Sequence, residues 1–344
     1  MIDISAEVIL RLLHKALDPS WQFSLPEGID WGKVLQLAQA QGVAGICLEA
    51  IEHLPIGSIP KEQLPQWICQ EEVQRGQFQN SWEVARKLDR LWNSDGIHAT
   101  VLKGRSVAQY YSVPEHRFSN DLDVFIGAGW DRACELLESK GVRLGREVYK
   151  EVEFVINGVY VECHRFITPL RGNKPLQKFE VYLRSLLENG SYFEGTTLMC
   201  PPLMFSVMLY IEHALGDYLH GKLSLKHVVD WIVLRRQTVD WKEFELKCKE
   251  FKFDRFVGLI NALADAVEGK ASYKSLSPLY QQAFFELFLH PNGKTSRSWF
   301  QRRVALFFVI IRNWKKFRNF GYTSMPVFLF NSVWAHFFNG EMKA

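Results

Sequence analysis

The alternation of apolar and polar positions divides the chain into helical flanks and a short β-rich middle. From residue 6 to 17, apolar residues recur at the spacing of a helix with one buried face. Asp30 is placed to cap a second helix, and Gly42 lies near its end. Prolines around Gly57 predict a loop, and residues 66–93 predict a long helix. Its buried side is expected to comprise Trp67, Val73, Phe78, Trp82, Ala85, Leu88, Leu91 and Trp92.

The pattern changes after Asp95-Gly96, where short apolar runs replace the helical spacing. The predicted elements are a strand at 97–102, a helix at 105–111, a strand at 122–126, a helix at 130–140 and a hairpin whose strands, 151–156 and 159–164, flank Asn157-Gly158. From Pro201 onward the periodicity is helical again. This order predicts an α+β fold, in which helical regions flank a small mixed sheet.

Four regions follow from these changes of pattern. We expect an N-terminal helical region at 1–95, an α/β core at 96–170, a C-terminal helical region at 171–294 and a helical tail at 295–344. The tail is basic and rich in aromatic residues. A packed helix with a solvated basic face is the favoured interpretation, and contact with a membrane surface or with nucleic acid is the alternative.

Composition narrows the class of protein. The 344 residues are 47% hydrophobic and 23% charged, which is typical of a globular protein with a substantial core. The net charge of +3 is too small to require a polyanionic partner, so nucleic acid is not an expected ligand. Six scattered cysteines without a CxxC motif argue against a zinc site and favour a reducing compartment. The N-terminus lacks a signal-peptide pattern and the apolar run at 304–311 is too short to span a membrane, so a cytoplasmic location is expected.

Three carboxylates form the candidate chemical centre. Asp121 and Asp123 lie two residues apart on a predicted strand, so both side chains point to one face. Glu162 lies on a later strand and shares its face with His164. If the strands pair, the three carboxylates converge, and oxygen ligands of this kind suit Mg²⁺ or Mn²⁺. Such a centre serves two-metal phosphoryl chemistry. His164 either positions a ligand, acts as an acid or base, or has a structural role.

A glycine turn precedes the carboxylates. Lys103 and Gly104 end one strand and open a helix, where backbone N–H groups can face a phosphate. Ser106 adds a hydroxyl group, and Arg117 can bind phosphate oxygens bidentately. The alternatives without a role in phosphate binding are an ordinary tight turn at Gly104 and a solvated loop residue at Arg117.

These motifs resemble the DNA polymerase beta-type nucleotidyltransferase superfamily and, more closely, the bacterial family of uncharacterised nucleotidyltransferases. The resemblance rests on Leu102-Lys103-Gly104, on Arg117 to Asp123 and on Glu162-Cys163-His164, and it extends over roughly residues 5–270. It implies that Asp121, Asp123 and Glu162 bind the ions, and that a nucleoside monophosphate passes from an NTP, in the first instance ATP, to an acceptor hydroxyl group. The acceptor is not implied.

Two departures from the superfamily pattern keep other functions open. Arg105 follows Gly104 where a second small residue is usual, and Glu162 replaces an aspartate. A non-catalytic nucleotide-binding or regulatory module on the same fold is therefore the alternative, and a metal-dependent sugar transferase ranks last. His213, His220 and His227 are spaced too widely on one helix to share a metal, and a break at Gly216 and Gly221 is expected. Packing is their expected role, although His213 or His220 can line the cleft.

Overall fold

The computed structural model describes residues 2–22, 24–147, 149–169, 174–289, 312–321 and 327. The N-terminal helices are α1 (Ile4–Leu17), α2 (Trp31–Ala40), α3 (Ala44–Ile51) and α4 (Leu64–Asn93). The middle contains β1 (Thr100–Val101), α5 (Lys103–Ala108), η1 (Pro114–His116), β2 (Asp121–Phe125), η2 (Gly127–Gly129), α6 (Trp130–Ser139), β3 (Leu144–Glu147), β4 (Glu151–Ile156) and β5 (Val159–His164). There follow α7 (Lys174–Leu187), β6 (Ser191–Tyr192), β7 (Met199–Cys200), α8 (Leu203–Leu219), α9 (Leu225–Arg235), α10 (Trp241–Glu250), α11 (Asp254–Val267), η3 (Tyr273–Ser275), α12 (Pro278–Leu289) and α14 (Trp314–Phe320).

The strands form one mixed sheet of order β3-β4-β5-β2-β1-β7-β6, which confirms the α+β class. β2 runs parallel to β5, whereas β1 pairs antiparallel with β2. The predicted hairpin is present as β4 and β5, and Asn157 and Gly158 both have positive φ, as its tight turn requires. The sheet also extends past residue 170, because β7 pairs with β1 and carries β6 at the edge.

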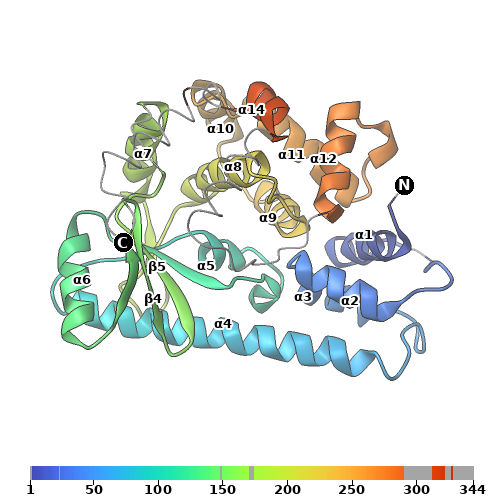
Figure 1. The fold of residues 1–344 in the computed structure, drawn as a ribbon, viewed down its shortest axis with the longest axis horizontal. Coiled ribbons are helices and arrows are strands. Elements are labelled where there is room, and N and C mark those ends of the chain that lie inside the picture. The colour runs from blue at the N-terminus through green and yellow to red at the C-terminus, as the bar shows by residue number, and fades with distance from the viewer. Residues whose placement is uncertain are drawn as a thin grey trace.

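Two apolar clusters divide the molecule. The smaller one joins the sheet to α4 and α6 and includes Leu122 and Val124 of β2, both fully buried. The larger one joins α1–α3 to the helices that follow the sheet. In Figure 1 the helices α8 and α9 lie above α5 and the sheet, while α4 runs beneath both halves of the molecule. The face of β2 opposite its buried apolar side chains is therefore left for polar groups under α8 and α9.

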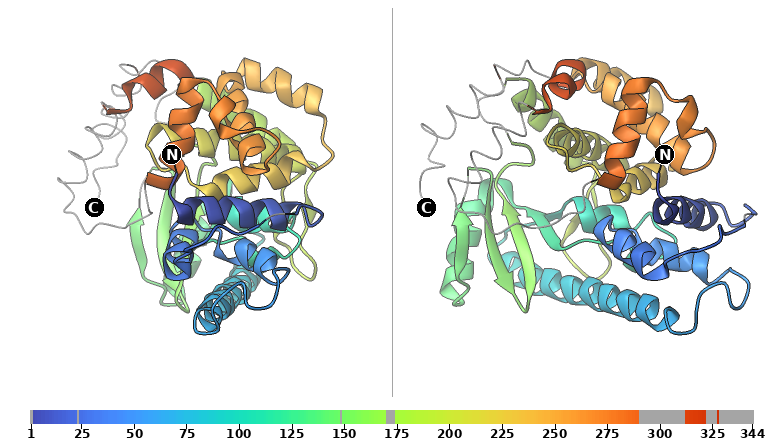
Figure 2. Two further views of the ribbon diagram at one scale, coloured as in Figure 1. Left: turned by 90° about the vertical axis from the view of Figure 1, so that its right-hand side faces the viewer. Right: turned by 45° about the vertical axis from the view of Figure 1, so that its right-hand side comes forward.

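The helix α4 contacts several loops of the sheet along its length (Figure 2). Gln74 donates to the carbonyl of Glu115 just before Arg117, at 2.8 Å. Nearly two turns further, Asn80 donates to the carbonyl of Asn157 in the hairpin turn, at 3.0 Å. Asp89 accepts from the backbone N–H of Thr197, at 3.0 Å. Half of the predicted apolar stripe is buried (Trp67, Ala85, Leu88 and Trp92), and Phe78, Trp82 and Leu91 are partly buried. Val73 is 50% exposed, because the buried face of the helix passes through Gln74 instead.

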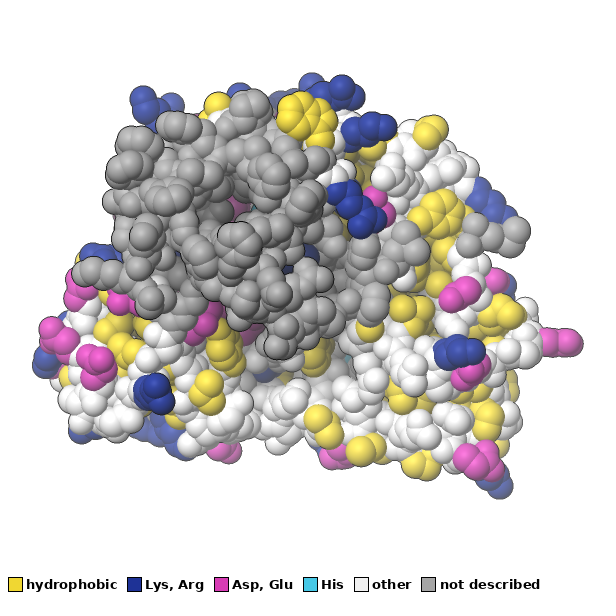
Figure 3. Space-filling model, in the orientation of Figure 1, with side chains coloured by type: hydrophobic (Ala, Val, Ile, Leu, Met, Phe, Trp, Pro, Cys, Tyr) yellow, Lys and Arg dark blue, Asp and Glu magenta, His cyan; other side chains and the backbone are white. Residues whose placement is uncertain are grey.

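The C-terminal helices carry the basic surface that is visible on one face. Lysine and arginine side chains gather along the upper edge of the molecule, around α10 and α14 (Figure 3). Within the predicted tail, α14 packs on the helices before it, and Lys316 forms a 2.6 Å ion pair with Glu286. The rest of the tail lies outside the described residues. Within the described ranges, no helix has the length and apolar character that a bilayer crossing requires.

Candidate active site

The register of two parallel strands brings the second aspartate beside the glutamate. β2 and β5 pair so that Asp123 lies opposite Glu162, while Asp121 lies opposite Tyr160. Asp123 and Asp121 point away from the buried face that Leu122 and Val124 occupy, as strand alternation requires. The two strands therefore hold two carboxylates at one level of the sheet.

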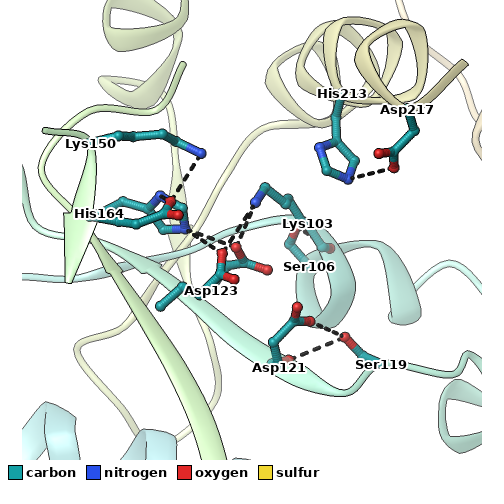
Figure 4. A network of polar contacts seen from close by, with 11 residues as sticks. Lys103, Ser106, Ser119, Asp121, Asp123, Lys150, His164, His213 and Asp217 are labelled. Atoms are coloured by element: carbon teal, nitrogen blue, oxygen red, sulfur yellow. Dashed lines mark hydrogen bonds and ion pairs between the residues drawn. The ribbon is translucent and has the colours of Figure 1, made fainter. Parts of the chain in front are cut away.

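Lys103 lies between these carboxylates. Its ammonium group is 2.6 Å from Asp123 Oδ1 (Figure 4). The same group is 3.9 Å from Glu162 Oε2. The backbone of Lys103 adopts a φ of 43°, in the left-handed region that side chains disfavour. Strain of this kind costs about 1–3 kcal/mol and persists where the surroundings impose it, frequently at functional sites. The strained turn directs the lysine side chain into the carboxylate cluster.

The electrostatics of the cluster are uneven. Burial acts to raise the pKa of Asp123, but the charge of Lys103 and the hydrogen bond from His164 outweigh it and hold that pKa well below the usual range. Burial, and next the charge of Asp123, raise the pKa of Glu162 to about 8. The charge of Lys103 thus offsets that of Asp123, and the second carboxylate, Glu162, lacks a full countercharge. A divalent cation suits this donor set, because it supplies the additional positive charge.

His164 contacts the carboxylate of Asp123 from the buried side of the cluster. The imidazole is fully buried, and its Nε2 atom lies 2.8 Å from Asp123 Oδ1. Its Nδ1 atom lies 3.0 Å from Glu151 Oε2, and Lys150 lies 3.2 Å from the same oxygen. Carboxylate–histidine contacts of this kind orient metal ligands. This geometry supports a positioning role for His164.

Asp121 stands apart from that cluster. Its Oδ1 atom accepts a hydrogen bond from Ser119 Oγ at 3.1 Å, and the side chain lies nearer the glycine turn (Figure 4). Asp123, Glu162 and His164 offer ligand atoms within 4.8 Å of one another, and Asp121 is not part of that group. Asp121 nevertheless lines the same cavity.

The glycine turn forms the floor of this cavity. Lys103, Gly104 and Ser106 all line it, and Ser106 Oγ donates to the carbonyl of Lys103 at 3.0 Å. A Cβ atom at Gly104 would lie 2.6 Å from Arg117 Nη1 and 3.1 Å from the Cβ atom of Ser119. Only glycine permits this approach.

Replacement of Gly104 with alanine tests the turn. We expect a loss of about 1–3 kcal/mol in the free energy of unfolding, because Ser119 and Arg117 must move. Gly76 in α4 is the matched control: a Cβ atom there would point into open space, so Gly76→Ala should stabilise by about 0.5–1 kcal/mol. Urea unfolding of both variants measures the difference. An unchanged midpoint for Gly104→Ala would contradict the close packing.

Arg117 is held by a partner that the sequence patterns did not suggest. Its Nε and Nη2 atoms donate to the two oxygens of Asp230 in α9, at 3.1 and 2.8 Å. The hydroxyl group of Tyr111 donates to Asp230 as well, at 2.5 Å. Both members of the ion pair are buried. Arg117 is therefore fixed between the sheet and α9, while its Nη1 atom faces the turn at Gly104.

Arg105, the unusual residue at the turn, points away from the cavity. Its Nε atom donates to Ser81 Oγ of α4 at 3.0 Å, and its guanidinium group lies 4.5 Å from the centre of the Phe78 ring. Burial, and next the charge of Arg117, lower the pKa of Arg105 to about 10. The side chain anchors α5 to α4, so this departure from the superfamily pattern leaves the cavity open.

The opposite wall of the cavity is formed by α8 and α9. His213 and Asp217 project from α8 above the carboxylates (Figure 4), with His213 Nε2 3.5 Å from Asp217 Oδ2. His227 Nε2 lies 3.1 Å from the same oxygen, and His213 and His227 line the cavity. The prediction that these histidines are too far apart to share a metal was wrong for His213 and His227, because they lie on two helices that pack together. With Asp217 they offer ligand atoms within 4.8 Å of one another. Gly216 also lies within α8, and the helix ends before Gly221.

Comparison with known proteins identifies the family. The family model described as uncharacterised nucleotidyltransferase matches residues 27–268. The chain belongs to this family. No curated protein and no solved structure matches it. The matched region of this nucleotidyltransferase covers α2 to α11 and thus includes the glycine turn, the carboxylates and the opposite wall. Membership supports nucleotidyl transfer as the general activity.

Proposed function

We propose that this protein transfers a nucleoside monophosphate from an NTP, in the first instance ATP, to a hydroxyl-bearing acceptor and releases pyrophosphate. The observation that carries the proposal is the cluster of Asp123 and Glu162 around Lys103, at the edge of a glycine turn. The family supports the class of reaction, and the cluster supports its dependence on Mg²⁺ or Mn²⁺.

The site residues predicted from the sequence divide the roles in this proposal. Asp121, Asp123 and Glu162 would hold the ions, which neutralise the phosphates and lower the pKa of the acceptor hydroxyl group. Of the two oxygens of Asp123, Lys103 and His164 both contact Oδ1, which leaves Oδ2 for a cation. The raised pKa of Glu162 reflects the uncompensated negative charge that a cation would offset.

The turn supplies the phosphate contacts. Gly104 allows the nucleotide to approach the backbone closely, and Ser106 offers a hydroxyl group in the same cavity. Lys103 would exchange one of its carboxylate contacts for a phosphate oxygen. Arg117 presents its Nη1 atom to the turn, where it would stabilise charge that develops during transfer.

Nucleotide binding with and without metal tests the proposal. The protein is titrated with ATP in Mg²⁺, in Mn²⁺ and in EDTA, by calorimetry. We expect binding in either metal and at least a tenfold loss in EDTA, since the carboxylates otherwise repel the phosphates. ATP labelled at the α-phosphate should label an acceptor, whereas ATP labelled at the γ-phosphate should not. Metal-independent binding, or transfer of the γ label, would contradict the proposal, and preferential UDP-sugar binding would favour a sugar transferase.

One observation favours a second candidate, a nucleotide-binding module without turnover. Lys103 already satisfies Asp123 with a buried ion pair, as a residue that had replaced the ion would. The same titration separates the two: binding of ATP without label on any acceptor, and without release of pyrophosphate, favours the module.

A further inference from the structure

Lys226 lines the cavity from the wall opposite the carboxylates. It is the second residue of α9 and is half-buried. Its aliphatic stem packs on the turn after α2: a Cβ atom at Gly42 would lie 3.2 Å from Lys226 Cδ and 3.3 Å from Lys226 Cβ. The start of α9 is thereby fixed on α2, and the ammonium group is held at the cavity.

The cations of the cavity differ in their partners. Lys103 is paired with Asp123, and Arg117 is paired bidentately with Asp230. Lys226 Nζ has no hydrogen bond or ion pair with any residue in the described part of the chain. Burial, and next the charge of Arg117, lower the pKa of Lys226. Asp230, Asp121 and Asp217 act on the ammonium group only from beyond ion-pair distance. A half-buried ammonium group without a direct partner costs free energy, which an anionic ligand in contact with it would recover.

The backbone N–H groups at the start of α9 already have hydrogen-bond acceptors within the protein. The N–H group of Ser224 donates to His227 Nδ1 at 3.1 Å, and that of Leu225 donates to Gln41 Oε1 at 3.0 Å. The N–H group of Lys226 donates to the carbonyl of Gln41 at 3.2 Å. The helix N-terminus therefore offers little to an anion, and the ammonium group of Lys226 is the donor that remains.

The position of Lys226 along the cavity indicates which part of the ligand it meets. The turn at Gly42 that Lys226 packs on also lies against Phe118, the neighbour of Arg117, since a Cβ atom at Gly42 would lie 3.4 Å from Phe118 Cδ1. His213 instead projects from α8 above Lys103 and Asp123 (Figure 4). Lys226 thus lies nearer the turn, and His213 lies nearer the Asp123–Glu162 pair.

We propose that Lys226 binds the terminal phosphates of the nucleotide, so that the polyphosphate extends from the Asp123–Glu162 pair toward Arg117 and α9. This proposal rests on the proposed function, since it assumes a nucleoside triphosphate in the cavity. It assigns the wall near His213 to the acceptor, because the opposite end is filled by phosphate.

The test compares ligands that differ in their phosphates. Calorimetry with Mg²⁺ measures the binding of ATP, AMP and inorganic tripolyphosphate to the full chain and to Lys226→Met. We expect ATP and tripolyphosphate to bind about tenfold more weakly to the variant, because one charge-assisted hydrogen bond is lost. The affinity for AMP should be unchanged. Lys222→Met is the matched control, because it removes the same charge at an exposed position that does not line the cavity, and it should bind all three ligands normally.

Stability distinguishes a ligand-binding lysine from a structural one. Without ligand, Lys226→Met should melt at the same temperature as the natural protein or higher, because an unpaired charge is removed, and Lys226→Arg should restore most of the ATP affinity. A lower melting temperature, unchanged ATP binding or an equal loss for AMP would each overturn the proposal. If the natural protein binds neither ATP nor tripolyphosphate, both proposals fail. If the natural protein binds tripolyphosphate, Lys226→Met does not, and the natural protein transfers no nucleotide, then Lys226 keeps its role in phosphate binding and the transferase proposal fails.

Discussion

Replacement of Asp123 with asparagine should abolish metal-dependent nucleotidyl transfer while leaving the fold intact. Asp123 is the carboxylate that Lys103 and His164 both contact, and it lies opposite Glu162 on the sheet. Asparagine keeps the size of the side chain and removes its charge. Mutations of groups that merely orient a ligand cost about 10–100-fold in metal affinity, so loss of the ligand itself should cost at least about 100-fold.

The fold should tolerate this change because the charges rearrange. The charge of Asp123 is, after burial, the main cause of the raised pKa of Glu162. Without that charge, the pKa of Glu162 should fall, and the ionised carboxylate can pair with Lys103 in place of Asp123. The melting temperature of the metal-free variant should therefore change little.

Binding of Mn²⁺, measured by electron paramagnetic resonance, checks this result without knowledge of the acceptor. Asp131→Asn is the control, since that carboxylate is exposed on α6 and its loss should leave Mn²⁺ affinity unchanged. Near-normal Mn²⁺ affinity in Asp123→Asn would show that Asp123 is not a ligand. A collapse of the melting temperature would instead assign Asp123 a structural role.

The second large effect concerns the ion pair between Asp230 and Arg117. Asp230→Ala should destabilise the protein by about 3–5 kcal/mol, because it leaves the guanidinium group buried without a countercharge and removes the acceptor for Tyr111. Asp95→Ala is the matched control: it breaks the ion pair with Arg132, whose side chain is 54% exposed, and should cost at most about 1 kcal/mol.

Urea unfolding, monitored by tryptophan fluorescence, measures both losses. A double replacement, Arg117→Met with Asp230→Leu, should be less destabilising than Asp230→Ala alone, since no unpaired charge remains. If Asp230→Ala and Asp95→Ala unfolded at the same urea concentration, the claim that the buried ion pair stabilises the fold more than the exposed one would be wrong. The double variant should also bind ATP weakly, because it lacks the guanidinium group that Arg117 presents to the glycine turn.

Local patterns predicted the parts of the site that depend on neighbouring residues. The strand alternation that places Asp121 and Asp123 on one face is a property of five consecutive residues, and the structure contains that strand. The Asn157-Gly158 hairpin was predictable for the same reason, because the turn geometry is set by two residues.

Contacts between distant segments were not predictable from one sequence. Asp230 lies more than a hundred positions from Arg117, and nothing local selects that partner. A signal did exist: Asp230 interrupts the apolar run from 228 to 234, and a carboxylate buried in such a helix requires a cation. His213 and His227 were missed as neighbours because their meeting depends on how α8 and α9 pack. The location of Lys103 among the carboxylates depends on its unusual φ, which residue type does not predict.

The long helix α4 also sets a limit on how this chain can change in length. Its contacts to Glu115, to the hairpin turn at Asn157 and to Thr197 come from Gln74, Asn80 and Asp89, which are spread over about four turns of a single helix. Insertion of one residue at Gly76 would rotate everything on one side of it by about 100° relative to the other, so these contacts could not all be kept. About half of α4 faces solvent, whereas the number of residues between Gln74 and Asp89 is tied to these three contacts. In this family, α4 should therefore vary in composition far more readily than in length.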